Sequence, residues 1–112
     1  MTSLALSNID GVRIVRLGGT LNQRGVEEIE PAFISAAREG GPMVVDLSGV
    51  DIINTPGLAI MLSSHREAQR AGGKMILTGM NTALCDLLHR CQLDRIFVVV
   101  PRIEDAIAQA KV

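Results

Sequence analysis

One hydroxyl residue, Thr55, lies where the sequence predicts the start of a helix, and it is the residue best placed for phosphoryl chemistry. We expect Thr55 at the N-cap, because its Oγ can accept a hydrogen bond from a free amide of the first turn. Pro56 then takes the first helical position, where its missing N–H costs nothing, and Gly57 takes the second. The same free amides and the positive end of the helix dipole suit a phosphate. Thr55 is therefore interpreted either as a cap alone or as a phosphorylation site.

The other chemically capable side chains form no catalytic or metal-binding set. Asp46 ends a predicted strand, but no Ser/His/Asp or Cys/His set has a recognisable spacing and no Gly-rich phosphate loop is present. Cys85 and Cys91 are six residues apart, with His89 between them. These three side chains are too few for a zinc site, and a spacing of six places the two cysteines on different faces of a helix, which disfavours a mutual disulfide. His65 falls near the apolar face of its predicted helix, so we interpret it as a partly buried structural histidine. We expect no enzyme, no cofactor and no metal.

The composition is that of one compact domain over residues 1–112. Hydrophobic residues make up 47% and charged residues 21%, which excludes a disordered chain. The formal net charge is -1 and neither Trp nor Tyr occurs, so the sequence offers neither a basic surface nor stacking platforms for nucleic acid. No apolar run approaches the length of a membrane span, and no signal peptide is recognised. We expect a cytoplasmic protein that binds no nucleic acid and does not insert into a membrane.

The elements that must position Thr55 alternate in type and predict an α/β domain in the order ββαβαβαβα. Asp10-Gly11 predicts a hairpin, Gly18-Gly19 is expected to end its second strand, and Ser48–Thr55 is expected to be a loop. Pro31 either kinks the first helix or marks the start of its second half. We predict a mixed central sheet of about five strands with about four helices. The predicted strands are Leu4–Asn8, Val12–Leu17, Met43–Leu47, Lys74–Thr78 and Ile96–Val100; the helices follow Asn22 as N-cap, begin at Pro56, span Thr82–Cys91 and run from Ile103 to Ala110.

Ile60 lies away from the stripe that Leu58 and Met61 form on the predicted second helix. Two interpretations are open. An exposed isoleucine beside Thr55 would contact a docking protein. Alternatively, both faces of this helix are covered and Ile60 belongs to the core.

Three segments carry a family resemblance. A buried strand ends in Asp46-Leu47 and leads to Asn54-Thr55-Pro56-Gly57-Leu58, much as a family strand leads to Asp-Ser-Ser-Gly-Leu or Asp-Thr-Ser-Gly-Leu. Cys91–Phe97 resembles the family's Gly-Leu-Asp-Lys-Leu-Phe, and Arg16–Asn22 resembles its early Leu-x-Gly-Glu-Leu-Asp. The family is that of STAS domains, and in particular the SpoIIAA-like anti-sigma factor antagonists. The similarity covers nearly the whole chain and implies a single STAS-like domain.

The resemblance also implies a function by protein–protein binding. In such antagonists the hydroxyl at the position of Thr55 is phosphorylated by the partner, an anti-sigma factor that is also a serine/threonine kinase of the GHKL type. Phosphorylation releases the partner, and a PP2C-type phosphatase resets the antagonist. The residues expected to contact the partner are Asn22, Asn54, Pro56, Gly57, Leu58 and Ile60.

This sequence departs from the family motif near Thr55. Asn54 stands for the motif's Asp, Pro56 for its second hydroxyl, and Thr20 and Asn22 for the early Glu and Asp. Two alternatives therefore stand beside the phosphorylation switch. One is a phosphorylation-independent STAS adaptor of a sensory scaffold or of an ABC-type lipid transporter. The other is a nucleotide binder that uses the expected loop Ser48–Thr55.

Overall fold

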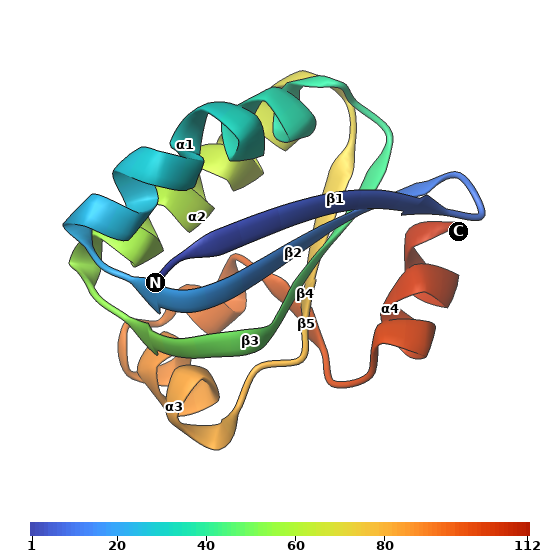
Figure 1. Ribbon diagram of the computed structural model, residues 1–112. Helices are drawn as coiled ribbons and strands as arrows, with labels where there is room; N and C mark the ends of the chain where they lie inside the picture. The colour runs from blue at the N-terminus through green and yellow to red at the C-terminus, as the bar shows by residue number, and fades with distance from the viewer.

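The structure is a computed structural model that describes residues 1–112, and it contains one five-stranded sheet in the order β1-β2-β3-β4-β5 (Figure 1). Only β1 runs antiparallel to its neighbour, so the predicted mixed sheet and the element order are confirmed. The elements are β1 (Ser3–Ile9), β2 (Val12–Leu21), α1 (Gln23–Arg38), β3 (Pro42–Ile53), α2 (Thr55–Arg70), β4 (Lys74–Thr78), α3 (Thr82–Arg90), a short 3-10 turn (Leu93–Arg95), β5 (Val98–Val100) and α4 (Ile103–Ala110).

The hairpin turn between β1 and β2 is the predicted Asp10-Gly11 pair. Both residues have positive φ angles, 54° and 81°, as a two-residue type I′ turn requires. The side chain of Asn8 supports the turn, because its Oδ1 accepts a hydrogen bond from the Gly11 N–H at 3.1 Å. This turn fixes the register of the whole hairpin, in which Ile9 lies opposite Val12 and Ser3 opposite Gly18.

The sheet has two unequally covered faces. Helices α1, α2 and α3 lie on one side of it, and α4 lies on the other (Figure 1). The larger core, of 21 buried residues, is aliphatic around Phe33 and lies under α1, α2 and α3. The smaller core has six buried residues and joins Ala106 and Ala110 of α4 to the sheet. No helix is both long enough and apolar enough to cross a bilayer.

Two predicted strand ends were wrong. Gly18-Gly19 does not end β2, and Ser48–Ile53 is not a loop, because β2 continues to Leu21 and β3 to Ile53 as a parallel pair. The pair has register shifts between Arg16 and Gly18 and between Gly19 and Thr20. Gly19 has a φ of 84° and lies against the carbonyl of Met1, so any side chain there would clash. The two glycines are thus the residues that let a bulged strand continue.

Two further boundaries differ by smaller amounts. Helix α1 runs through the exposed Pro31 from Gln23 to Arg38, so Pro31 does not divide it. Strand β5 begins at Val98 instead of Ile96, because Ile96 closes the preceding 3-10 turn with its N–H bonded to the Leu93 carbonyl at 3.0 Å.

Candidate functional site

The start of α2 is fixed by the ends of two parallel strands. Strand β3 ends at Ile53, and the next N–H, that of Asn54, donates a hydrogen bond to the carbonyl oxygen of Leu21 at 3.1 Å. Leu21 is the last residue of β2. The residue that precedes Thr55 is therefore held by the sheet, and Thr55 lies at the edge where the parallel strands end, as ligand and partner sites of α/β proteins commonly do.

The expected cap at Thr55 was wrong by one residue. Asn54 has the extended N-cap conformation, and its carbonyl accepts the N–H groups of Gly57 at 2.9 Å and Leu58 at 3.2 Å. Thr55 is consequently the first helical residue, followed by Pro56. No side chain caps this helix, so the exposed Thr55 hydroxyl is not used to satisfy a helix amide. Helices α1 and α3 differ, since the side chains of Asn22 and Asn81 cap them.

Gly57 has a structural function at this helix start. A Cβ atom there would come within 2.8 Å of the Ile53 Cγ2 and of the Leu21 backbone. Only glycine lets the first turn of α2 approach the strand ends this closely. Gly57 was predicted at the second helical position, but it is the third because Asn54 is the N-cap, and the residue is buried against the strands.

A groove of about 290 Å³ lies between α1 and α2 and includes Thr55 at one end. Its floor is apolar, and its only charged lining residues are Glu27 and Glu30 of α1. Glu27 also accepts a hydrogen bond from the Gln23 side chain at 2.9 Å. The residues that line this groove are Gln23, Val26, Glu27, Glu30, Thr55, Pro56, Ala59, Ile60 and Ser63.

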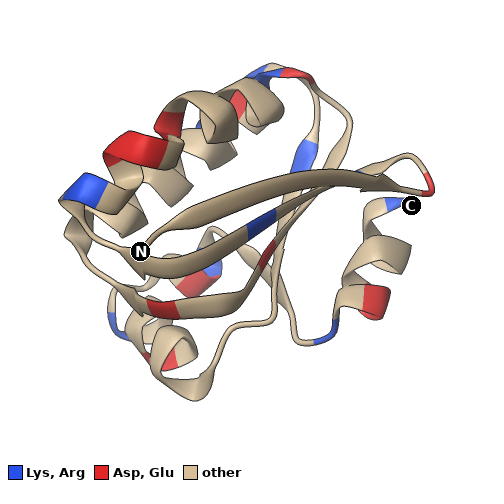
Figure 2. Cartoon of the chain, in the orientation of Figure 1, with Lys and Arg blue, Asp and Glu red and all other residues tan.

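Helix α1 brings acidic residues to this groove. Figure 2 shows the acidic residues gathered on the first half of α1, with a basic residue at its start. Carboxylates beside Thr55 create a negative local field at the hydroxyl. The early family motif has acids at the positions of Thr20 and Asn22, and in this chain the acidic charge lies instead one to two turns along α1.

The residues expected to contact a partner divide into accessible and buried ones. Asn54 is exposed, Pro56 and Leu58 are half-buried, and Gly57 and Ile60 are buried. Asn22 is half-buried and caps α1, where its Oδ1 accepts the Gly25 N–H at 2.9 Å.

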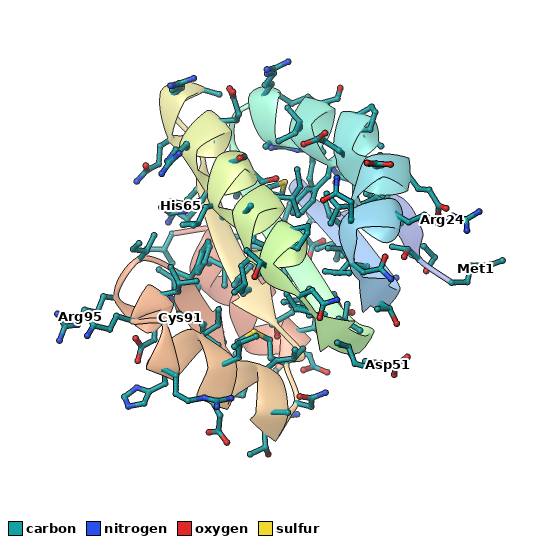
Figure 3. The ribbon with its side chains drawn as sticks, turned by 90° about the vertical axis from the view of Figure 1, so that its left-hand side faces the viewer. Met1, Arg24, Asp51, His65, Cys91 and Arg95 are labelled. Atoms are coloured by element: carbon teal, nitrogen blue, oxygen red, sulfur yellow. The ribbon has the colours of Figure 1, made fainter.

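Ile60 is a core residue, so the interpretation of an exposed docking contact was wrong. Its side chain is 2% exposed and belongs to the larger core, because α2 is covered by α1 on one side and the sheet on the other. An exposed isoleucine does lie near Thr55, but it is Ile52, which is 54% exposed in β3. Asp51 beside it points outward next to the start of α2 (Figure 3). Ile52 was missed because its segment was expected to be a loop, without a face assigned to each residue.

His65 lies on α2 well away from Thr55, and it is partly buried as predicted. Its ring packs edge-to-face on Phe97, with 5.5 Å between centroids. Burial lowers the pKa of His65, because the imidazolium would lose hydration there. Its Nδ1 is buried without a hydrogen-bond partner. These contacts give His65 a packing function between α2 and the segment that leads into β5.

Asp46 lies in β3 directly before the register shift between β2 and β3. Its Oδ1 accepts the Ser48 N–H at 3.0 Å, and its Oδ2 lies 3.4 Å from Arg16 Nε. Asp46 lies beside Arg16 on β2 and Thr78 on β4. Its interactions are with neighbouring residues of the sheet, which indicates a structural function.

The remaining titratable candidates are exposed. His89 Nδ1 lies 2.8 Å from Asp94 Oδ2, and this interaction raises the pKa of His89 and lowers that of Asp94. Cys85 and Cys91 are free and exposed, so neither is a core residue and they form no disulfide.

The fold and the exposed Thr55 at the helix start define a class of protein. The family model of the STAS domain matches residues 3–110, and the chain therefore belongs to the STAS domain family. A curated relative, BtrV of Bordetella bronchiseptica, is a candidate anti-sigma factor antagonist. It is 27% identical over 109 residues, which span 96% of this chain and 94% of BtrV.

Solved structures share the fold. An anti-sigma factor antagonist from Mycobacterium paratuberculosis has a TM-score of 0.89 at 22% identity, and the match covers 100% of this chain and 96% of that one. The Bacillus cell fate determinant SpoIIAA in its phosphorylated form has a TM-score of 0.71 at 18% identity, over 96% of this chain and 98% of that one. The chain thus has the STAS fold of anti-sigma factor antagonists over nearly its whole length.

Proposed function

We propose that this STAS protein is an anti-sigma factor antagonist-like regulator that binds an anti-sigma factor with serine/threonine kinase activity and is released when that partner phosphorylates Thr55. The observation that carries the proposal is the exposed Thr55 hydroxyl at the first position of α2, where it serves no capping function. The motif position in the STAS family supports it, as does a relative whose structure is of a phosphorylated form. The partner on this proposal is a GHKL-type kinase, and a PP2C-type phosphatase restores the unmodified protein.

The local physics favours a switch of binding without unfolding. A phosphate adds about -1.5 to -2 charges, and the helix start tolerates an anion because of the positive end of its dipole, although Pro56 has no N–H and the Gly57 N–H is already bonded to the Asn54 carbonyl. The same phosphate enters the groove that Glu27 and Glu30 line. A partner that matches this surface with basic side chains would meet a changed charge and volume after phosphorylation. Phosphorylation therefore changes the surface of the groove, while the strands that hold Asn54 stay in place.

The surface offered to the partner combines polar and apolar contacts. Ile52 supplies the exposed apolar side chain, and Asn54, Pro56 and Leu58 surround the hydroxyl. Gly57 and Ile60 are buried, so they shape the first turn of α2 without contacting the partner.

The experiment is a calorimetric titration of a GHKL-type anti-sigma factor kinase from the same organism with four proteins: wild type, Thr55→Ala, Thr55→Glu and Thr82→Glu. Thr82 is the matched control, because it is exposed and is the first residue of α3, as Thr55 is of α2. We expect wild type, Thr55→Ala and Thr82→Glu to bind with similar affinity and Thr55→Glu to bind at least about tenfold more weakly, which is about 1.4 kcal/mol. Equal binding of Thr55→Glu and wild type would rule out the switch.

A second candidate is a phosphorylation-independent STAS adaptor of a scaffold or transporter ATPase. The observation that favours it is the chemistry beside Thr55, where Asn54 and Pro56 stand at the positions of the motif's carboxylate and second hydroxyl. Stable co-purification with an ATPase or scaffold protein that Thr55→Glu leaves unchanged would support the adaptor against the switch.

A further inference from the structure

Two carboxylates of the groove beside Thr55 are not balanced by any cation. Glu27 and Glu30 form no ion pair, and the side chain that donates a hydrogen bond to Glu27, the amide of Gln23, is neutral. No Lys or Arg lines this groove. Asp51, exposed next to the start of α2, forms no ion pair either (Figure 3). The surroundings of Thr55 are therefore negative without local compensation.

The other acidic residues of α1 and α2 are paired within the chain. Glu28 Oε1 lies 4.0 Å from Arg24 Nε, and Glu67 Oε2 lies 3.4 Å from Arg38 Nε. Neither pair lines the hollow that Thr55 lines. The lack of a basic partner is thus specific to the two glutamates that share the groove with Thr55.

The first turn of α2 has few donors that could offset this negative charge. Pro56 has no N–H, and the N–H groups of Gly57 and Leu58 are both bonded to the Asn54 carbonyl. Helix starts that bind phosphate do so through free backbone N–H groups. A phosphate on Thr55 would therefore meet the two carboxylates with little more than the helix dipole in its favour.

The groove is small enough for these charges to interact. Its volume is about 290 Å³. The groups that line so small a hollow lie within about one Debye length of each other, which is about 8 Å at physiological ionic strength. Two carboxylates at such a separation should raise the second pKa of a phosphate by about half a unit, which is about threefold in the equilibrium between its two charged forms.

We propose that Glu27 and Glu30 destabilise the phosphorylated form of Thr55 by charge repulsion, so that the switch favours the unmodified, partner-binding form. This inference rests on the proposed function, which supplies the phosphate. In that transfer the bond between the β–γ bridging oxygen and the γ-phosphorus of ATP breaks, a bond from the Thr55 oxygen to that phosphorus forms, and ADP and the hydroxyl proton are released. The two glutamates take no part in the exchange of bonds and act only on the charge of the product.

A ³¹P NMR titration of the full chain, with phosphothreonine incorporated genetically at position 55, tests the inference without a kinase. It measures the second pKa of the phosphate, which is about 6 without neighbouring charges. The titration compares the wild-type background with Glu27→Gln/Glu30→Gln, whose two sites are exposed, and with Glu104→Gln/Asp105→Asn, which removes two carboxylates from α4 across the sheet (Figure 1). We expect the second pKa to be about half a unit lower in the groove variant than in the other two proteins, and the difference to shrink at high salt. The same second pKa in all three proteins overturns the proposal.

The phosphoryl-transfer equilibrium tests the consequence for the switch. Each unmodified protein is incubated with a GHKL-type anti-sigma factor kinase at a fixed ratio of ATP to ADP, and intact mass gives the ratio of phosphorylated to unmodified protein. This ratio should be at least about threefold higher in Glu27→Gln/Glu30→Gln than in wild type or the α4 variant. An unchanged ratio overturns the proposed bias. If no protein gains a phosphate, the proposed function is contradicted instead, and the titration still decides whether the two glutamates repel a phosphate at this position.

Discussion

Gly57 packs directly against Leu21, where a Cβ atom would lie 2.8 Å from both the Cβ and the carbonyl oxygen of that residue. Leu21 is the same residue whose carbonyl accepts the Asn54 N–H. One strand end therefore fixes α2 on both sides of Thr55. The position of the exposed hydroxyl depends on this contact between a helix and a strand, and not on capping by its own side chain.

Substitution of Gly57 by alanine should destabilise the protein by about 1–3 kcal/mol, because the added methyl group must displace the strand backbone or the helix start. Urea unfolding followed by circular dichroism measures this free energy. Ser63→Ala, an exposed site on the same helix, is the control and should change stability by no more than about 0.5 kcal/mol. A Gly57→Ala protein as stable as wild type would contradict the packing described for this turn.

Asp46 should tolerate substitution by Asn better than by Ala. The Asp46→Asn variant keeps an oxygen that accepts the Ser48 N–H and loses only the interaction with the half-exposed Arg16, which is worth about 0–1 kcal/mol. Alanine also leaves that N–H without its side-chain acceptor, which costs about 1–3 kcal/mol. Urea unfolding of Asp46→Asn and Asp46→Ala tests the difference. Equal losses in the two variants would mean that the charge, and not the hydrogen bond, matters.

His65 should make the protein less stable as the pH falls below about 6.5. Burial lowers its pKa from 6.5 in the folded state, so the unfolded chain takes up the proton first. The contribution of His65 to the free energy of unfolding is present above its pKa in the unfolded chain. This contribution is lost as the pH falls toward its lower pKa in the folded protein. His89 acts in the opposite direction, because Asp94 raises its pKa; its contribution is present below 6.5 and is lost as the pH rises through the raised value.

The comparison that isolates His65 uses a His89→Gln background. The free energy of unfolding is measured in urea at pH 7.5 and pH 5.5, which lie on either side of the ordinary His pKa of 6.5. It should decrease from pH 7.5 to pH 5.5 by more in His89→Gln than in the double variant His65→Gln/His89→Gln. The carboxylates contribute equally to both proteins and cancel. The same pH dependence in the two proteins would show that His65 titrates as it does in the unfolded chain.

The acidic groove should control how fast a partner docks. Glu27→Gln combined with Glu30→Gln removes the only two charges that line it, while Gln23 and Ser63 keep the surface polar. If basic side chains of the partner face this groove, the association rate should fall by about tenfold and lose much of its salt dependence. Stopped-flow or surface plasmon resonance at two salt concentrations measures both. A matched change of Glu104→Gln and Asp105→Gln on α4, across the sheet, should leave the rate unchanged.

Local signals in the sequence predicted much of the architecture. Asp10-Gly11 favours a type I′ turn and Asn22 favours an N-cap, and both features occur as expected. The hydroxyl residue directly before Pro56 placed Thr55 at a helix start, which the fold confirms to within one residue. The shift arose because both Asn54 and Thr55 can cap a helix, and the choice depends on the Asn54 hydrogen bond to Leu21. That bond joins residues from different strands, which no local pattern reveals.

The errors share a tertiary cause. Gly18-Gly19 has the composition of a turn and Ser48–Ile53 that of a loop. Both segments are nevertheless strand, because β2 and β3 pair with each other there as bulged parallel strands. Ile60 could be assigned to the core only once α1 was known to cover α2. The exposure of Ile52 and the acidic groove beside Thr55 likewise depend on that arrangement.

Phosphate transfer to Thr55 is the claim on which the proposed function rests. The intact mass of wild type, Thr55→Ala and Thr82→Ala, measured after incubation with a GHKL-type anti-sigma factor kinase and ATP, tests it most directly. Wild type and Thr82→Ala should each gain the mass of one phosphate, and Thr55→Ala should gain none. No added mass on wild type, or equal addition to Thr55→Ala, would contradict the assignment of Thr55 as the switch.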